Sequence, residues 1–146
     1  MTISVRQPWA TLLAHSLKHY ETRSWRTRYE GPLAIHASAR FAPEDYAWTI
    51  QTPAVCKLLA KCGYTDASQL PLGCLLAAGQ LVGCWPTRTF PVAGLSRVER
   101  TLGDFSPGRW AWRLSNVKLL SQPIPYKGAL GLWQCTIPDN AFEVQP

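Results

Sequence analysis

The stretch Cys74–Trp85 is almost entirely apolar, and this feature limits the fold more than any other. Gly79 and Gly83 interrupt it, and Pro86 ends it. A membrane-spanning helix needs about 20 apolar residues, and no run in the chain approaches that length, so we expect no membrane association. The pattern predicts a strand that is covered by protein on both faces, as strands of small barrels are.

Shorter extended segments occur on either side of this strand, with glycine and proline between them. Strands are predicted at residues 2–5, 20–28, 33–38, 109–114 and 131–137. Gly31-Pro32 and Ser106-Pro107-Gly108 predict turns, while Pro123, Pro125 and Gly128 are expected to interrupt the chain before the last strand. Many short strands separated in this way predict a small barrel.

Four segments carry the signals of helices. The first is expected to begin at Pro8 and to end near Lys18. The second begins at Pro43, which is followed by two acidic residues, as the helix dipole prefers. The third, residues 52–63, has apolar residues at helical spacing, and the fourth begins at Ser96, with a glutamate three residues later. The expected fold class is therefore mixed α/β but mainly β, with about four helices around the barrel.

Length and cysteine usage predict one domain in a reducing compartment. No linker or repeat divides the 146 residues, and residues 139–146 are expected to form a loose C-terminal tail. The five cysteines form no CxxC pair, and the chain does not start like a signal peptide. We therefore expect a cytoplasmic protein with reduced thiols, without a cofactor or a metal site.

The formal net charge is +6, and the excess is uneven. Residues 1–40 contain six arginines and lysines but only two acidic residues. A basic region favours anionic partners such as phosphate groups. A positive charge that only keeps the protein soluble is the alternative explanation.

The main candidate site is the group Lys18, Glu21 and Arg23, which we call the Lys18 cluster, with Trp25 two residues further on. The cluster falls where the first helix is expected to end and the next strand to begin. Lysine supplies a mobile point charge, and arginine a planar fork for phosphate or a base edge. Glu21 can accept from an exocyclic amine or hold both cations. An ordinary surface ion-pair network is the alternative.

Two further groups are weaker candidates. His36 and Ser38 share one face of a strand, Arg40 follows in the loop, and together they can line a polar pocket. A histidine bonded to backbone at a strand end is the alternative, which the residues alone favour. Arg109 follows a tight turn and lies on the face opposite Trp110, so we expect it to contact a ligand while the tryptophan belongs to the core.

Three early segments occur together in a recognisable order. They are Ser4–Ala10 (SVRQPWA), Lys18–Trp25 (KxxExRxW) and Gly31–Ser38 (GPLAIHAS). In this order they resemble the activating signal cointegrator homology family, called ASCH. Residues 103–112 and 123–133 are similar to the same family's longer bacterial and phage members, so the resemblance covers most of the chain.

The resemblance implies a PUA-like β-barrel with a cleft beside the first helix, lined by the Lys18 cluster. We add Gln7 and Trp9, from the first segment, to the expected ligand-binding residues, and Trp9 or Trp25 would offer a face for stacking. Members of the family are thought to bind RNA or other nucleic acid. Some small bacterial members hydrolyse N4-acetylcytidine, and a related member cleaves RNA.

Two departures from the family pattern bear on the chemistry. The family often has glycine where this chain has Ser16, and the small amidohydrolases have a threonine, their proposed nucleophile, where this chain has Glu21. A carboxylate is a poor substitute for a hydroxyl in attack on an amide. A variant mechanism stays open, in which Glu21 activates water while Lys18 stabilises the oxyanion.

The leading hypothesis is a module that binds RNA or a nucleotide-like ligand. DNA stays open, because contacts to the 2′-hydroxyl depend on geometry. The alternative is a hydrolase, either an N4-acetylcytidine amidohydrolase or a ribonuclease, with Lys18 and Glu21 as its catalytic residues. A third option is an adaptor whose protein partner covers the cleft. The residues favour binding, since no complete set of nucleophile and base is visible.

Overall fold

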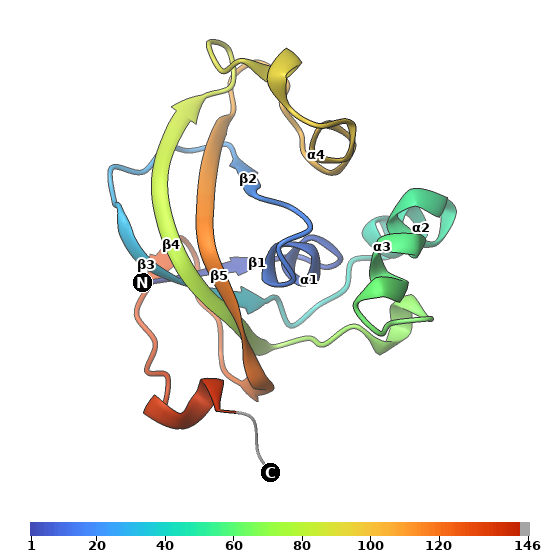
Figure 1. Cartoon of the computed structure of the whole chain (residues 1–146), viewed down its shortest axis with the longest axis vertical. Helices are drawn as coiled ribbons and strands as arrows, with labels where there is room; N and C mark the ends of the chain where they lie inside the picture. The colour runs from blue at the N-terminus through green and yellow to red at the C-terminus, as the bar shows by residue number, and fades with distance from the viewer. Residues whose placement is uncertain (144–146) are drawn as a thin grey trace.

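Six strands form one curved sheet in the computed structural model, which describes residues 1–143. Their order is β2-β5-β4-β3-β1-β6, with β1 and β3 parallel and all other neighbours antiparallel. The long strands β4 and β5 bend along their length, so that the sheet curls into a half-barrel (Figure 1). The strands are β1 (Thr2–Val5), β2 (Tyr20–Arg23), β3 (Gly31–Ala37), β4 (Cys74–Pro86), β5 (Trp110–Pro125) and β6 (Leu132–Trp133).

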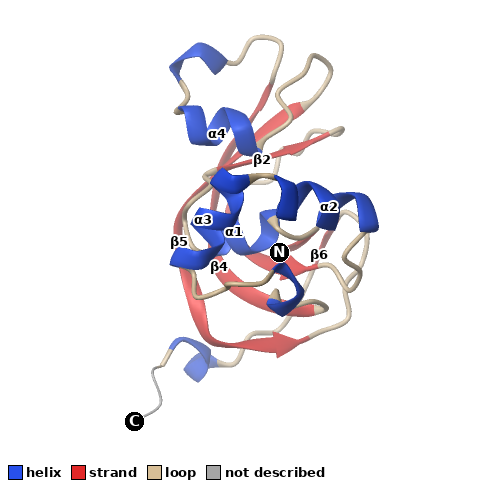
Figure 2. Cartoon of the chain, turned by 90° about the vertical axis from the view of Figure 1, so that its right-hand side faces the viewer, coloured by secondary structure: helices blue, strands red, loops and turns tan. Residues whose placement is uncertain are grey.

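The α-helices gather on the concave side of this sheet (Figures 1 and 2). They are α1 (Trp9–Ala14), α2 (Pro43–Gln51), α3 (Pro53–Lys61) and α4 (Arg97–Leu102). A curled, mainly antiparallel sheet with four helices confirms the expected class, mixed α/β, mainly β and of the PUA-like kind. None of the helices within residues 1–143 has the length and apolar character needed to cross a membrane.

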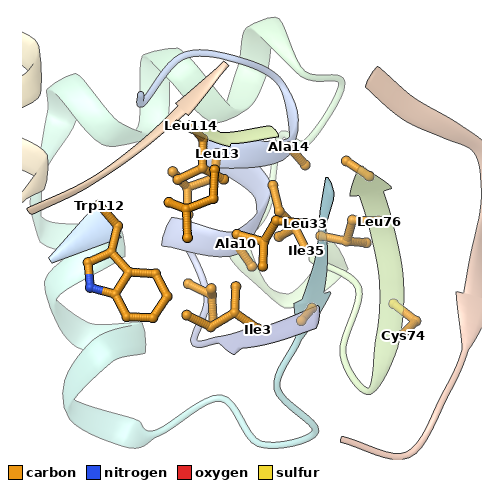
Figure 3. Packing of buried hydrophobic residues seen from close by; sticks show 14 residues of the cluster. Ile3, Ala10, Leu13, Ala14, Leu33, Ile35, Cys74, Leu76, Trp112 and Leu114 are labelled. Carbon is orange, nitrogen blue, oxygen red and sulfur yellow. The ribbon is translucent and has the colours of Figure 1, made fainter. Parts of the chain in front are cut away.

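Helix α1 lies at the centre of the main core, inside the curve of the sheet. Its Leu13 belongs to one cluster with Ile3 of β1, Ile35 of β3 and Trp112 of β5, and none of these four side chains is more than 1% exposed (Figure 3). Apolar side chains from several strands thus converge on one short helix. Burial of this apolar surface stabilises the curl of the sheet around α1.

The long apolar strand predicted from Cys74 onward is confirmed as β4, but only its first half is buried on both faces. Leu76 belongs to the main core, while its neighbour Leu75 belongs to a second cluster with Leu120 and Ala141. Near the other end of the strand, Trp85 is 41% exposed. The expected cover on both faces therefore does not extend to the end of β4.

The first helix is shorter than predicted. It ends at Ala14 and not near Lys18, because Ser16 has a left-handed φ of 58°, which an α-helix does not accommodate. The backbone N–H groups of Leu17 and Lys18 both donate to the carbonyl of Leu12, at 3.0 and 3.2 Å. Lys18 therefore lies in the turn between α1 and β2.

Several strand predictions were wrong in extent. Strand β2 ends at Arg23, well before residue 28, and Gly31-Pro32 begins β3 and does not form a separate turn. Strand β5 continues through Pro123 to Pro125, because β2 pairs only with residues 110–113 and leaves a free edge beyond them, where a missing N–H is tolerated. Strand β6 contains two residues where seven were expected.

The end of the chain was expected to be loose from residue 139 onward. Residues Asp139–Phe142 form a 3-10 helix, η3, in which Ala141 is 8% exposed. The hydroxyl of Ser121 on β5 donates to the carbonyl of Ala141 at 2.9 Å. Residues 144–146 lie outside the described part of the chain.

The core position of Trp112 gives the first prediction. Trp112→Ala removes a fully buried indole, and such truncations cost about 3–5 kcal/mol of unfolding free energy. Urea denaturation followed by circular dichroism measures this loss. Trp85→Ala, which truncates a tryptophan that is 41% exposed, is the matched control and should cost clearly less. Equal costs for the two variants would contradict the central role of Trp112.

Candidate functional site

A cavity of about 480 Å³ lies where the start of α1, the end of α4, strand β2 and the residue just before β5 meet. Its charged lining consists of Arg6, Lys18, Arg23, Arg109, Glu21 and Asp104. Its aromatic lining consists of Trp9, Trp25 and Trp48. Six of the ten residues expected at a ligand site thus share this cavity, namely Trp9, Lys18, Glu21, Arg23, Trp25 and Arg109.

Lys18 is the most deeply buried charged group of this lining, with 2% of its surface exposed. Its ammonium donates to the carbonyl of Tyr20, and it forms no ion pair with a carboxylate of residues 1–143. Burial lowers the pKa of Lys18, while the charges of Glu21 and Glu99 act in the opposite direction. The cavity therefore contains a buried lysine whose proton is held less tightly than in water.

Glu21 and Arg23 lie on the inward face of β2. One carboxylate oxygen of Glu21 accepts from the backbone N–H of Thr22 at 3.0 Å, and the other is 3.5 Å from Nη1 of Arg23. The same Nη1 donates to the carbonyl of Ser4 on β1, at 3.2 Å. Arg23 is therefore fixed between the edge strand β2 and β1, which lies near the opposite edge of the curled sheet.

Trp25 connects the cavity to the core. The guanidinium carbon of Arg23 lies 5.7 Å from the centre of the Trp25 ring. On the core side, Trp112 meets Trp25 edge to face with 4.7 Å between ring centres, and its indole N–H donates to the carbonyl of Trp25 at 3.4 Å. The position of Trp25 thus depends on Trp112, the largest of the fully buried side chains in the described part of the chain.

Glu99 of α4 supports the cavity, although we had predicted it only as part of a helix cap. Ser96 accepts from the backbone N–H of Glu99 at 3.1 Å, which is one half of the predicted capping box. The carboxylate does not bond back to Ser96. It accepts from the backbone N–H groups of His19, at 3.0 and 3.1 Å, and of Tyr20, at 2.8 Å. Only 4% exposed, Glu99 ties α4 to the residues that follow Lys18.

Trp48 is a lining residue that the sequence did not indicate. It stacks on Trp9 with 5.2 Å between ring centres and 20° between planes. The indole N–H of Trp9 donates to the carbonyl of Leu102 at 2.8 Å. The Arg6 guanidinium lies 5.6 Å from the Trp9 ring and 3.3 Å from Asp45. This wall is therefore assembled from α1, α2 and α4, which no local motif reveals.

Arg109 completes the charged lining at the start of β5. Its Nη2 donates to the carbonyl of Thr22 at 3.0 Å, and its Nε is 3.4 Å from Asp104 without a well-aligned hydrogen bond. Hydrogen bonds from Ser106 lower the pKa of the Asp104 carboxyl, and the Arg109 charge adds to this effect. Asp104 is therefore a stable counter-charge at this edge.

Four of the expected residues lie outside the cavity lining. Gln7 is buried and bonds to backbone at both ends of its amide, to the Pro71 carbonyl and the Thr11 N–H. His36, 1% exposed, contacts the Ser4 hydroxyl at 3.0 Å and the carbonyl of Tyr126 at 2.7 Å. This is the backbone-bonded histidine that we gave as the alternative. The remaining two, Ser38 and Arg40, follow the end of β3.

Comparison with known proteins identifies the same family that the sequence resembles. The sequence model of the ASCH domain family matches residues 3–118. Over 89 residues, the chain is 35% identical to Activating signal cointegrator 1 from Homo sapiens and 34% identical to the protein of that name from Mus musculus. Each match covers 60% of this chain, and it spans only 15% of the length of the relative.

The buried lysine predicts a pH dependence of stability. The unfolded chain keeps the Lys18 proton up to its ordinary pKa of 10.5, whereas burial lowers the pKa of Lys18 in the fold. Between these two values the unfolded state binds more protons, so stability rises with pH. Urea denaturation at several pH values should show the unfolding free energy of the wild type rising relative to Lys18→Met as the pH approaches 10.5.

Lys57→Met, which removes an exposed lysine on α3, is the matched control. The wild type should gain no comparable stability relative to that variant over the same pH range. A flat difference between the wild type and Lys18→Met would contradict the lowered pKa.

Proposed function

The chain belongs to the ASCH domain family, and from this membership and the cavity we propose that it binds RNA or a nucleotide-like ligand. The observation that carries the proposal is the charge of the cavity lining, four cationic side chains against two carboxylates. Such a surplus in a partly enclosed site attracts an anionic ligand, because the low-dielectric walls focus the field. A volume of about 480 Å³ suits a small ligand or one unit of a polymer.

Separate parts of a nucleotide have separate partners in this proposal. Arg23 presents a planar fork to a phosphate group, since only one of its terminal nitrogens is used by Ser4 and Glu21. Glu21 accepts from an exocyclic amine of a base. Lys18 donates to a carbonyl oxygen of the base from the buried end of the cavity. The fixed geometry of Arg23 and Lys18 reduces the entropy lost on binding.

Binding of a short RNA at several salt concentrations tests the proposal. The affinity should fall as salt rises, by about 0.7 logarithmic units per phosphate contact for each tenfold increase in salt. Arg23→Ala removes charge-assisted hydrogen bonds and should weaken binding about tenfold. Lys57→Ala removes the same charge outside the cavity lining and is the control. Fluorescence of the cavity tryptophans or of a labelled RNA measures the dissociation constant.

Two outcomes would contradict the proposal. One is the absence of binding to RNA, DNA and free nucleotides alike at low salt. The other is an equal loss of affinity in Arg23→Ala and Lys57→Ala, which would point to a general charge effect. Parallel titrations with RNA and DNA of one sequence distinguish the two polymers, since only RNA offers a 2′-hydroxyl.

We also propose hydrolysis as a second candidate function, because Lys18 is a buried amine with a lowered pKa beside two carboxylates. In this mechanism water attacks the acyl carbonyl of N4-acetylcytidine and gives its proton to Glu21. Lys18 stabilises the oxyanion, and the C–N bond then breaks as the amine leaves with a proton. The products are acetate and cytidine. Cleavage of RNA is the other reaction that the resemblance implies.

Chromatography of the products formed from N4-acetylcytidine or RNA tests this candidate. Lys18→Ala and Glu21→Ala should both abolish turnover while circular dichroism shows that the fold persists. The conservative Lys18→Arg keeps a cation, and it should not restore activity, because the larger, planar guanidinium does not place its charge where the Lys18 ammonium lies. A folded wild type that is inert against both substrates would rule out hydrolysis of them.

A further inference from the structure

Arginines pack over tryptophan rings in and beside the cavity. The pairs, with the distance from guanidinium carbon to ring centre, are Arg6 and Trp9 at 5.6 Å, Arg23 and Trp25 at 5.7 Å, and Arg26 and Trp110 at 5.5 Å. A guanidinium over an aromatic face is held in place by cation–π attraction, and its N–H groups stay available for a ligand.

The pair Arg26 and Trp110 is not part of the lining but adjoins it, with Arg26 in the loop after β2 and Trp110 at the start of β5. Arg26 directly follows the lining segment 23–25, and Trp110 directly follows Arg109. Arg23 and Trp110 are also register partners in the pairing of β2 with β5. Three residues of chain reach at most about 10 Å, so Arg26 stands within that distance of the position where Arg23 enters the cavity.

Arg26 differs from the other two arginines because it has no hydrogen bond or ion pair with the described residues 1–143. Arg6 is paired with Asp45, and Arg23 contacts Glu21 and the Ser4 carbonyl. The side chain of Arg26 is exposed, and within residues 1–143 neither an ion pair nor a hydrogen bond holds it. The Trp110 ring is the group over which its guanidinium packs. A guanidinium placed in this way is ready to receive an anion from solvent.

We propose that Arg26, held over Trp110, binds a backbone phosphate of a single strand whose neighbouring nucleotide occupies the cavity. The inference rests on the proposed function and specifies its ligand as a single-stranded polynucleotide. A base inside a duplex is stacked and paired, so it cannot enter a cavity of this kind without leaving the helix. A single strand can place one base inside while its backbone continues past Arg26.

The experiment compares a cytidine mononucleotide with a single-stranded RNA tetranucleotide. The tetranucleotide should bind the wild type more tightly, because only it reaches Arg26 as well as the cavity. Arg26→Ala should reduce the ratio of the two affinities by about fivefold, as expected for one exposed ionic contact. It should also reduce the steepness of the salt dependence for the tetranucleotide by about 0.7. Isothermal titration calorimetry measures both affinities.

Lys57→Ala is again the matched control, since it removes one charge on α3 and should leave the ratio unchanged. Equal affinity of the two ligands for the wild type would overturn this inference, and so would an unchanged ratio in Arg26→Ala. Neither result would disturb the proposed function, which predicts only that the cavity binds. If neither ligand binds the wild type, the proposed function itself fails.

Discussion

The buried ammonium of Lys18 is the group around which the cavity is organised. A cation this deep in a protein must have oxygen atoms near it, because burial without them costs several kcal/mol. Tyr20 supplies a carbonyl, and the Glu99 carboxylate holds the backbone of that same residue from the side of α4. The contact joins segments about 80 residues apart in the chain. The Glu99 hydrogen bonds hold α4 against the cavity. The Glu99 charge also raises the pKa of Lys18, so the ease with which Lys18 keeps its proton depends on where α4 is placed.

Local pattern predicted β1 and the apolar β4 well. The alternation of residues 2–5 and the apolar run that begins at Cys74 gave β1 and β4 with nearly correct bounds. The errors arose where neighbours decide the outcome. The left-handed Ser16 ended α1 early, and the free edge of β5 accommodated Pro123, which pattern alone treats as a strand breaker. Neither effect leaves a signal in a window of a few residues.

The Lys18 cluster could be found because its members lie within six residues of one another, on the turn before β2 and on β2 itself. The roles of Trp48 and Glu99 could not be found, since helix packing brings Trp48 to the cavity and Glu99 to the backbone that follows Lys18. Gln7 and His36 illustrate a different case. Both look like ligand-binding groups in sequence, yet their polar atoms are satisfied inside the protein. The sequence does not distinguish a buried polar residue that completes an internal hydrogen-bond network from one that binds a ligand.

The edge-to-face contact between Trp112 and Trp25 has a consequence for any attempt to redesign this protein. One indole fills the core and at the same time fixes a wall of the cavity, so the stability of the fold and the shape of the cavity depend on the same residue. Redesign of the cavity should therefore begin at Trp48, which stands on α2, apart from Trp25 and Trp112. Substitutions at Trp25 will alter the packing of the hydrophobic core together with the cavity wall that a ligand would contact.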